Sequence, residues 1–185
     1  MASLIILITG GARSGKSGYA LKRAEALADV RTFIATSPVT DPEMAERIAR
    51  HQEERDGRGW RLIEEQTDLP RAIGRAGPGV IVIDCLTLWI NNLLYQAEKR
   101  GQPFADAEMN GRCDRLIAAC RQHDGAVLLV TNEVGMGIVP ENALARHYRD
   151  LIGRANRRLA AAADEVVFVC CGIPLTIKKD FHETA

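Results

Sequence analysis

The strongest chemical pattern in the chain is G-x-x-x-x-G-K-[ST], which an aliphatic run at residues 4–8 precedes and a helical pattern follows. It is matched by eight consecutive residues: Gly10, Gly11, Ala12, Arg13, Ser14, Gly15, Lys16 and Ser17. Glycines let the backbone curl until successive N–H groups face an anion. Lys16 can then reach the β- and γ-phosphates of a nucleotide, and Ser17, at the head of the helix, is placed to hold Mg²⁺. A strand, the motif and a helix in register favour a phosphate-binding loop over a plain glycine-rich turn.

A second candidate is Asp84, which ends the apolar run VIVID at residues 80–84. This pattern is typical of a buried parallel strand whose terminal carboxylate reaches the water shell of a metal beside a phosphate-binding loop. An apolar run before an aspartate is common by chance, so Asp84 becomes a metal-site candidate only because the chain also contains the loop motif. We therefore expect Ser17 and Asp84 to position Mg²⁺ together.

A third group lies on the polar helix expected at residues 43–55, where Arg47, His51 and Arg55 are spaced i, i+4, i+8 and share one stripe. Two guanidinium groups beside an imidazole suit an anion, and their charge disfavours the imidazolium. A neutral His51 would have a ring nitrogen free to act as a nucleophile. The alternative, favoured by spacing alone, is a solvated charged helix whose histidine has no role.

The remaining polar candidates follow apolar runs that are expected to be strands. Asn132 and Glu133 follow the run at 126–131, and the run at 31–36 ends in Ser37 and Pro38. Ligands of open α/β sheets collect at the carboxyl ends of strands, so these side chains are expected near the phosphates. For Glu133, helix capping or solvation in a loop is an equal alternative.

Helices and strands are expected to alternate along the whole chain, and most of the strands are apolar throughout. Strands are expected at 4–8, 31–36, 60–65, 80–84, 126–131 and 165–171, with an edge strand at 175–177; helices are expected at 16–28, 43–55, 68–75, 86–100, 106–123 and 141–163. This order predicts an α/β fold of the P-loop NTPase type, a mainly parallel sheet with helices on both faces. No linker or internal repeat interrupts residues 1–185, which indicates a single nucleotide-binding domain.

Composition excludes several classes of protein. The formal net charge is zero, so no basic field for nucleic acid exists. The first apolar run is too short for an export signal or a membrane span, so no stable membrane insertion is expected. Five cysteines lack a C-x-x-C spacing and suit a reducing cytoplasm; the adjacent Cys170 and Cys171 are expected to be strand residues.

The loop indicates a nucleotide but not a reaction. No strand ends in the N-K-x-D motif of a switch GTPase, and a motor or transporter ATPase would normally be longer. A small-molecule kinase fits the length of 185 residues.

Several longer segments resemble one family, the bifunctional adenosylcobinamide kinase / adenosylcobinamide-phosphate guanylyltransferase. They are GGARSGKS at 10–17, ATS at 35–37, RIxxH at 47–51, DCLTLWIxN at 84–92 and TNEVGMGIVPEN at 131–142. The resemblance implies phosphorylation of the aminopropanol hydroxyl of adenosylcobinamide with ATP or GTP, followed by transfer of GMP from GTP to give adenosylcobinamide-GDP. It also implies that His51 carries GMP as a phosphoramidate. With the resemblance included, a functional role for the stripe of Arg47, His51 and Arg55 is favoured over a solvated helix. A single-function P-loop kinase without nucleotidyl transfer is the alternative.

The resemblance adds nucleotide-binding residues. It implies nucleotide contacts at Ala35, Thr36, Ser37, Gln52, Glu53, Glu54, Arg55 and Glu64, beside the loop residues and Asp84. The family often has proline after the arginine that ends HxxxR, whereas Asp56 follows Arg55 here, so the position of Glu64 is less firmly aligned. The resemblance further implies a homo-oligomer, expected to be a trimer.

Overall fold

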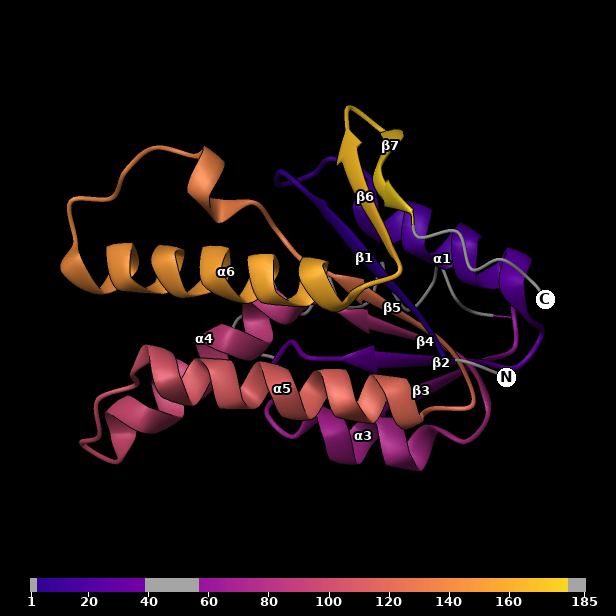
Figure 1. Ribbon diagram of the computed structural model, residues 1–185, viewed down its shortest axis with the longest axis horizontal. Coiled ribbons are helices and arrows are strands. Elements are labelled where there is room, and N and C mark those ends of the chain that lie inside the picture. The colour runs from indigo at the N-terminus through magenta and orange to yellow at the C-terminus, as the bar shows by residue number, and fades with distance from the viewer. Residues whose placement is uncertain (1–2, 39–56, 180–185) are drawn as a thin grey trace.

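All seven strands form one sheet in the computed structural model, which describes residues 3–38 and 57–179 (Figure 1). The strands are β1 (Leu4–Gly10), β2 (Arg31–Ala35), β3 (Trp60–Glu64), β4 (Gly79–Asp84), β5 (Gly125–Val130), β6 (Glu165–Cys170) and β7 (Ile173–Lys179). Their order is β3-β2-β4-β5-β1-β6-β7, and every neighbouring pair is parallel except β6 with β7. The mainly parallel sheet expected from the sequence is confirmed.

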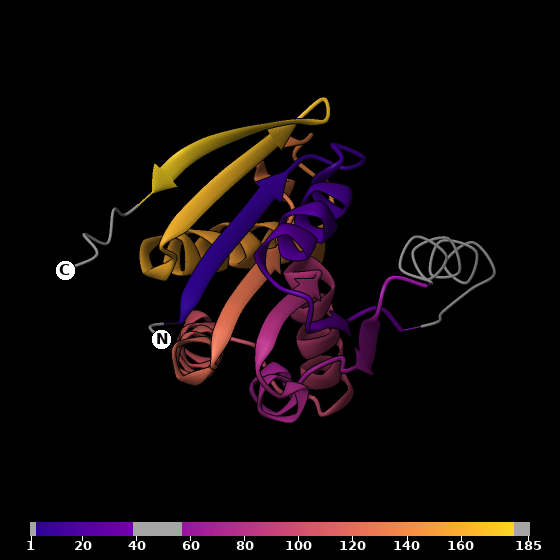
Figure 2. The same cartoon turned by 90° about the vertical axis from the view of Figure 1, so that its right-hand side faces the viewer.

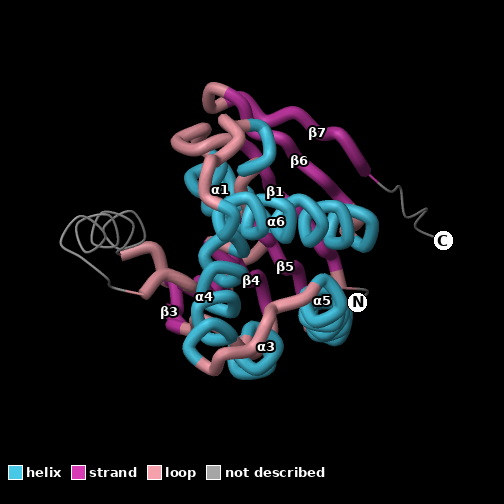
Figure 3. Tube along the Cα trace, turned by 90° about the vertical axis from the view of Figure 1, so that its left-hand side faces the viewer, coloured by secondary structure: helices cyan, strands magenta, loops and turns pink. Residues whose placement is uncertain are grey.

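Helices cover both faces of this sheet. They are α1 (Lys16–Leu27), α3 (Leu69–Ala76), α4 (Leu86–Lys99), α5 (Asp106–Gln122) and α6 (Ala143–Ala162), with a short 3-10 helix, η1 (Val134–Met136). Figures 2 and 3 show α1 on one face and α3, α5 and α6 on the other. The helix expected at residues 43–55 lies outside the described residues.

Alternating side chains of the aliphatic strands explain the two layers. On β1, Ile5 and Leu7 pack with α3, α4, α5 and α6, whereas Ile6 and Ile8 pack with α1. Successive side chains of a strand point to opposite faces, so a strand buried on both sides must be apolar throughout. The near-continuous aliphatic runs noted in the sequence are the consequence.

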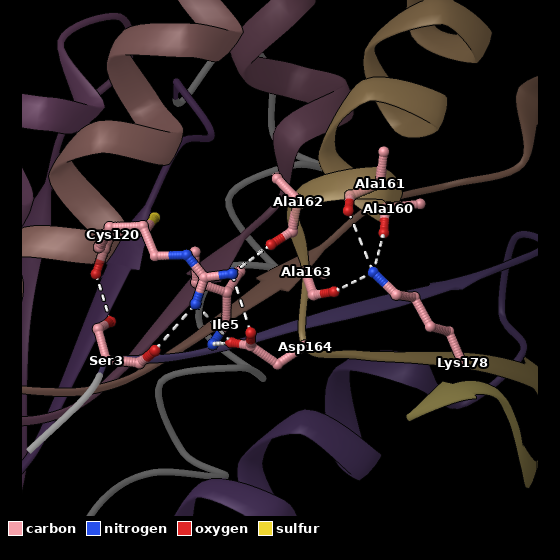
Figure 4. A network of polar contacts seen from close by, with 10 residues as sticks. Ser3, Ile5, Cys120, Ala160, Ala161, Ala162, Ala163, Asp164 and Lys178 are labelled. Atoms are coloured by element: carbon pink, nitrogen blue, oxygen red, sulfur yellow. Dashed lines mark hydrogen bonds and ion pairs between the residues drawn. The ribbon is translucent and has the colours of Figure 1, made fainter. Parts of the chain in front are cut away.

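Polar contacts join the start of β1 to the ends of α5 and α6 at the amino-terminal edge of the sheet (Figure 4). Asp164 accepts a hydrogen bond from the backbone N–H of Ile5 at 2.7 Å, and its two oxygens accept from Arg121 at 2.8 and 2.9 Å. Nearby, Lys178 Nζ donates to carbonyl oxygens at the end of α6, including that of Ala163 at 2.6 Å. These contacts lie at the opposite edge of the sheet from the loop that follows β1.

The last two strands differ from expectation. The edge strand runs over Ile173–Lys179 rather than 175–177, and Cys171 lies in the β6–β7 turn with φ of 51°. The expectation that Cys171 is a strand residue is therefore wrong, because the chain reverses there through Cys171 and Gly172. None of the helices within residues 3–38 and 57–179 is long and apolar enough to cross a membrane.

Candidate functional site

The loop between β1 and α1 has the tight backbone that the glycine pattern predicts. Gly15 adopts φ of 93° and Arg13 φ of 56°, both in the left-handed region. A Cβ on Gly10 would lie 2.3 Å from the carbonyl oxygen of Val169, so β6 approaches the loop too closely for any side chain. The carbonyl of Ser14 accepts a hydrogen bond from Gly172 N at 2.8 Å, which braces the loop against the β6–β7 turn.

Strand register brings three of the predicted site residues into one row. Ala35 pairs with Glu64 on β3 and with Asp84 on β4, at the carboxyl edge of the sheet. The same row continues through Val130 of β5 to Ile8 of β1, two residues before the loop begins. Residues in register point to the same face, and Ala35 packs on the α1 side. Glu64 and Asp84 therefore project toward the side of the sheet where α1 starts.

Lys16 begins α1, and Asp84 ends β4 on the face of the sheet that α1 covers. Lys16 is buried, and its Nζ donates a hydrogen bond to the carbonyl of Gly11 at 3.0 Å, so the ammonium lies over the loop. Burial raises the pKa of the Cys85 thiol, the neighbouring Asp84 carboxylate raises it further, and the Lys16 ammonium lowers it. Both charges thus act on the residue that follows β4. Ser17 is half-buried in the first turn of α1, beside Lys16.

The hydroxyl, backbone N–H and carbonyl of Thr36 all form hydrogen bonds within the protein. Its Oγ1 donates to the carbonyl of Cys85 and accepts from the N–H of Cys85, both at 2.8 Å. Its backbone N–H donates to the backbone carbonyl of Asp84, and its own carbonyl accepts from Asn92 Nδ2 at 2.9 Å. Thr36 is fully buried and locks the end of β2 to the end of β4. The predicted nucleotide contact of Thr36 stays a prediction, whereas its role in holding the two strand ends is visible.

A pocket of about 490 Å³ opens beside the ends of β2 and β3. It is lined by Ser37, Pro38, Glu64, Glu65, Gln66, Thr67 and Gln96. Its volume is in the range of small-molecule sites, and two of its lining residues, Ser37 and Glu64, are predicted nucleotide contacts. Partial burial acts to raise the pKa of Glu65, but the backbone N–H groups of Asp68, Thr67 and Gln66, together with the Arg71 guanidinium, lower that pKa overall.

A polar cluster lies at the ends of β1 and β5, on the face opposite α1. Glu133 Oε1 accepts hydrogen bonds from Thr9 Oγ1 at 2.5 Å and from Asn156 Nδ2 at 3.2 Å. Asn156, which is buried on α6, also accepts from Thr131 Oγ1 at 2.8 Å and donates to the carbonyl of Asn132. The Glu133 side chain makes no hydrogen bond that caps η1, so the capping alternative is wrong.

Several predicted site residues cannot be placed, because they fall in the segment 39–56 that lies outside the described residues. They are His51, Gln52, Glu53, Glu54 and Arg55, together with Arg47. The phosphate-binding loop, Ala35, Thr36, Ser37, Glu64 and Asp84 are all described, and they gather at the carboxyl edge of the sheet.

The structure adds three residues that were not predicted as site residues. Asn92 joins β2 to the start of the pocket, since it donates to the carbonyls of Thr36 and Gln66. Asn156 and Thr9 orient Glu133. Asn156 left a signal in the sequence, because it is a polar residue on the apolar stripe of α6, between Ile152 and Leu159.

A mainly parallel sheet with this strand order, a glycine-rich loop after β1 and an acid at the end of β4 defines an α/β protein of the P-loop NTPase type. Within that class, residues 6–177 match the model of the CobU family, described as cobinamide kinase / cobinamide phosphate guanyltransferase. The chain belongs to this family.

Three curated proteins are similar over nearly their whole length. The bifunctional adenosylcobalamin biosynthesis protein CobU of Salmonella typhimurium is 46% identical over 186 residues, and its namesake in Escherichia coli is 44% identical over 186 residues. Both alignments cover 95% of this chain and 100% of the relative. The protein CobP of Pseudomonas aeruginosa, with the same description, is 35% identical over 177 residues, which is 94% of this chain and 97% of the relative.

Proposed function

We propose that this chain is a bifunctional enzyme of cobalamin biosynthesis that phosphorylates adenosylcobinamide and then transfers GMP to the phosphate. In the first step, ATP or GTP phosphorylates the aminopropanol hydroxyl. In the second, GMP passes from GTP through a covalent adduct on His51 and gives adenosylcobinamide-GDP. Membership of the family and full-length similarity to bifunctional relatives support this assignment.

The observation that carries the proposal is that the loop, Lys16 and Asp84 lie at the carboxyl edge of the sheet, on the face that α1 covers. The loop amides and the Lys16 ammonium would bind the phosphates, with the field of the α1 N-terminus favouring their negative charge. Catalysis of phosphoryl transfer depends mainly on positioning and on neutralising charge in the transition state. We assign both functions to the loop, Lys16 and Asp84.

Mg²⁺ fits the same place. Magnesium takes oxygen ligands and is commonly held by one or two protein oxygens together with substrate phosphates. Ser17 and Asp84 offer a hydroxyl and a carboxylate, both half-buried, at the start of α1 and on the face that α1 covers. When bound, the ion would neutralise charge on the β- and γ-phosphates.

The pocket beside β2 and β3 supports nucleotide binding at Ser37 and Glu64. Carboxylate and amide groups of Glu64, Gln66 and Gln96 line it and can donate to or accept from the hydroxyl and amide groups of a nucleoside. Ala35 and Thr36 stand at the end of β2, directly before the lining residue Ser37, and their contacts with the nucleotide are part of the same proposal. The contacts of Gln52, Glu53, Glu54 and Arg55 are part of the same proposal.

In the nucleotidyl step, a neutral ring nitrogen of His51 attacks the α-phosphorus of GTP. A nitrogen–phosphorus bond forms, the bond to the bridging oxygen breaks, and pyrophosphate leaves with the electron pair. Arg47 and Arg55 would neutralise the charge that develops. The bound GMP then passes to the phosphate of adenosylcobinamide phosphate.

Labelling with two radioactive nucleotides tests the proposal. With GTP labelled at the α-phosphate, the wild-type protein should acquire a GMP label that is stable in base and labile in acid, and His51→Ala should acquire none. With ATP labelled at the γ-phosphate, both proteins should phosphorylate adenosylcobinamide, because His51 has no part in the first step. Lys16→Ala should lose the kinase reaction.

The outcomes separate the alternatives. Kinase activity without any protein-bound label would favour a single-function P-loop kinase. Nucleotide binding with neither reaction would leave only a nucleotide-binding module and would refute the enzyme assignment.

We further propose that residues 1–185 act as one domain in a homo-oligomer, a trimer by resemblance to the family, and that the protein is cytoplasmic. The single sheet supports the first point, and five free cysteines support the location. Light scattering coupled to size-exclusion chromatography would measure the number of subunits.

A further inference from the structure

Glu133 follows β5 and lies beside the first residue of the phosphate-binding loop. Its backbone N–H donates to the carbonyl of Gly10 at 3.1 Å, which extends the pairing of β5 with β1 beyond the last rung of the strand. The position of its Cα is therefore fixed by the same strand that delivers the loop. Among the described glutamates, Glu64 and Glu65 lie instead at the β3 end of the sheet, on the far side of β2 and β4.

The carboxylate of Glu133 is oriented through one of its two oxygens. Oε1 accepts from Thr9 Oγ1 and from Asn156 Nδ2, and the amide of Asn156 is itself held by Thr131 and Asn132. Oε2 has no hydrogen-bond partner among residues 3–38 and 57–179. A carboxylate held in this way presents one fixed, unused acceptor oxygen.

No cation neutralises this carboxylate within the described part of the chain, since its only polar partners there are a hydroxyl and an amide. A residue that only held Thr9 and Asn156 in place would need no more than a neutral hydrogen-bond acceptor. These contacts therefore do not explain why a carboxyl group rather than an amide stands at this half-buried position at the carboxyl edge of the sheet.

Asp84 and Glu133 lie on opposite faces of the sheet. Asp84 projects to the α1 side, where Ser17 and Lys16 begin the helix, whereas Glu133 contacts Thr9 and α6 on the other side. The carboxylates of Asp84 and Glu133 can therefore contact different groups of the substrates. Asp84 is placed for the metal and phosphates, and Glu133 is placed to meet a group that approaches the loop from the α6 side.

We propose that Glu133 is the general base of the phosphorylation step, an inference that rests on the kinase activity proposed above. The hydroxyl oxygen of the acceptor alcohol forms a bond to the γ-phosphorus of the nucleotide. The bond between that phosphorus and the bridging oxygen breaks, and the nucleoside diphosphate leaves with the electron pair. The hydroxyl proton passes to Glu133 Oε2 and then to solvent.

Glu133→Gln is the decisive substitution, because the carbonyl oxygen of glutamine can still accept from Thr9 and Asn156. Only the charge and the basic oxygen are lost. General base catalysis typically contributes about 10²- to 10⁴-fold, so kcat for phosphorylation of adenosylcobinamide should fall by that factor while KM for ATP changes by less than about threefold. Labelling of the protein by α-labelled GTP should continue at the wild-type rate.

Two further variants control for charge and for structure. Glu98→Gln removes the same charge from an exposed position near the end of α4 and should leave both reactions unchanged. Thr9→Val removes one of the two hydrogen bonds to Oε1 but keeps the carboxylate, so kinase kcat should fall by about tenfold or less, in line with the loss of one hydrogen bond.

The results divide cleanly. Selective loss of the kinase reaction in Glu133→Gln supports the proposal. A kinase kcat within fivefold of the wild-type value overturns it. An equal loss of both reactions with a lowered melting temperature also overturns it, because it would show that Glu133 has only a structural role. A wild-type protein that does not phosphorylate adenosylcobinamide would instead refute the kinase function itself.

Discussion

Replacing Gly10 by alanine should destabilise the protein through a single clash at the phosphate-binding loop. The added Cβ would lie 2.3 Å from the backbone carbonyl oxygen of Val169 and 2.8 Å from Ser14 Oγ. Ser14 can rotate its hydroxyl away. Val169 cannot retreat so easily, because it is paired with Gly10 at the last rung between β1 and β6.

The magnitude follows from the distance. A contact of 2.3 Å is roughly 1 Å short of ordinary van der Waals separation, so β6 must move or the rung must break. Overpacking of this kind costs about 1–3 kcal/mol, and a lost backbone hydrogen bond adds about 1 kcal/mol. We expect Gly10→Ala to lower the free energy of unfolding by about 2–4 kcal/mol, out of a total of about 5–15 kcal/mol.

Urea denaturation followed by far-ultraviolet circular dichroism measures this loss. With a slope of about 2–3 kcal/mol per molar, the midpoint should fall by about 1 M. Gly11→Ala is the matched control, since a Cβ at Gly11 has no heavy atom within 4 Å and should change the free energy by less than about 0.5 kcal/mol. Equal midpoints for the two variants would refute the reasoning.

Three further predictions concern stability and thiol chemistry. Asp164→Ala should cost about 2–4 kcal/mol in urea denaturation, because it leaves the buried N–H of Ile5 without its acceptor and breaks an ion pair whose carboxylate is buried. In the folded protein a thiol reagent should modify Cys170 and Cys171 quickly and the three buried cysteines only on unfolding. Burial raises the pKa of the Cys113 and Cys120 thiols from 9 to about 12. The free energy of unfolding should therefore fall as the pH rises from 9 towards 12, by on the order of 2 kcal/mol per thiol at about pH 10.5.

Each of these has its own check. Asp114→Ala breaks an ion pair in which both side chains are about half exposed, so it should cost less than about 1 kcal/mol; an equal cost for Asp164→Ala would contradict the role of burial. Five rapidly labelled thiols would contradict the burial of Cys85, Cys113 and Cys120. Cys113→Ala should lose less stability than the wild type between pH 8 and 10.5, and an identical slope would exclude this thiol as a source.

Local patterns in the sequence determine much of this protein. The loop at residues 10–17 and Asp84 could be predicted because a phosphate-binding loop needs glycines at set positions, and a buried parallel strand must be apolar up to its polar end. The role proposed for His51 comes from resemblance to the family, and this residue lies outside the described residues.

Only the tertiary structure decided which of these residues meet. Strand order and register place Glu64, Ala35 and Asp84 in one row, although they are far apart in sequence, and α6 brings Asn156 to Glu133. Register is set by pairing between distant strands, and packing is set by surfaces that no single segment contains. The sequence by itself therefore determined the chemistry available at the carboxyl edge of the sheet, whereas the folded arrangement decided which face of the sheet each group occupies.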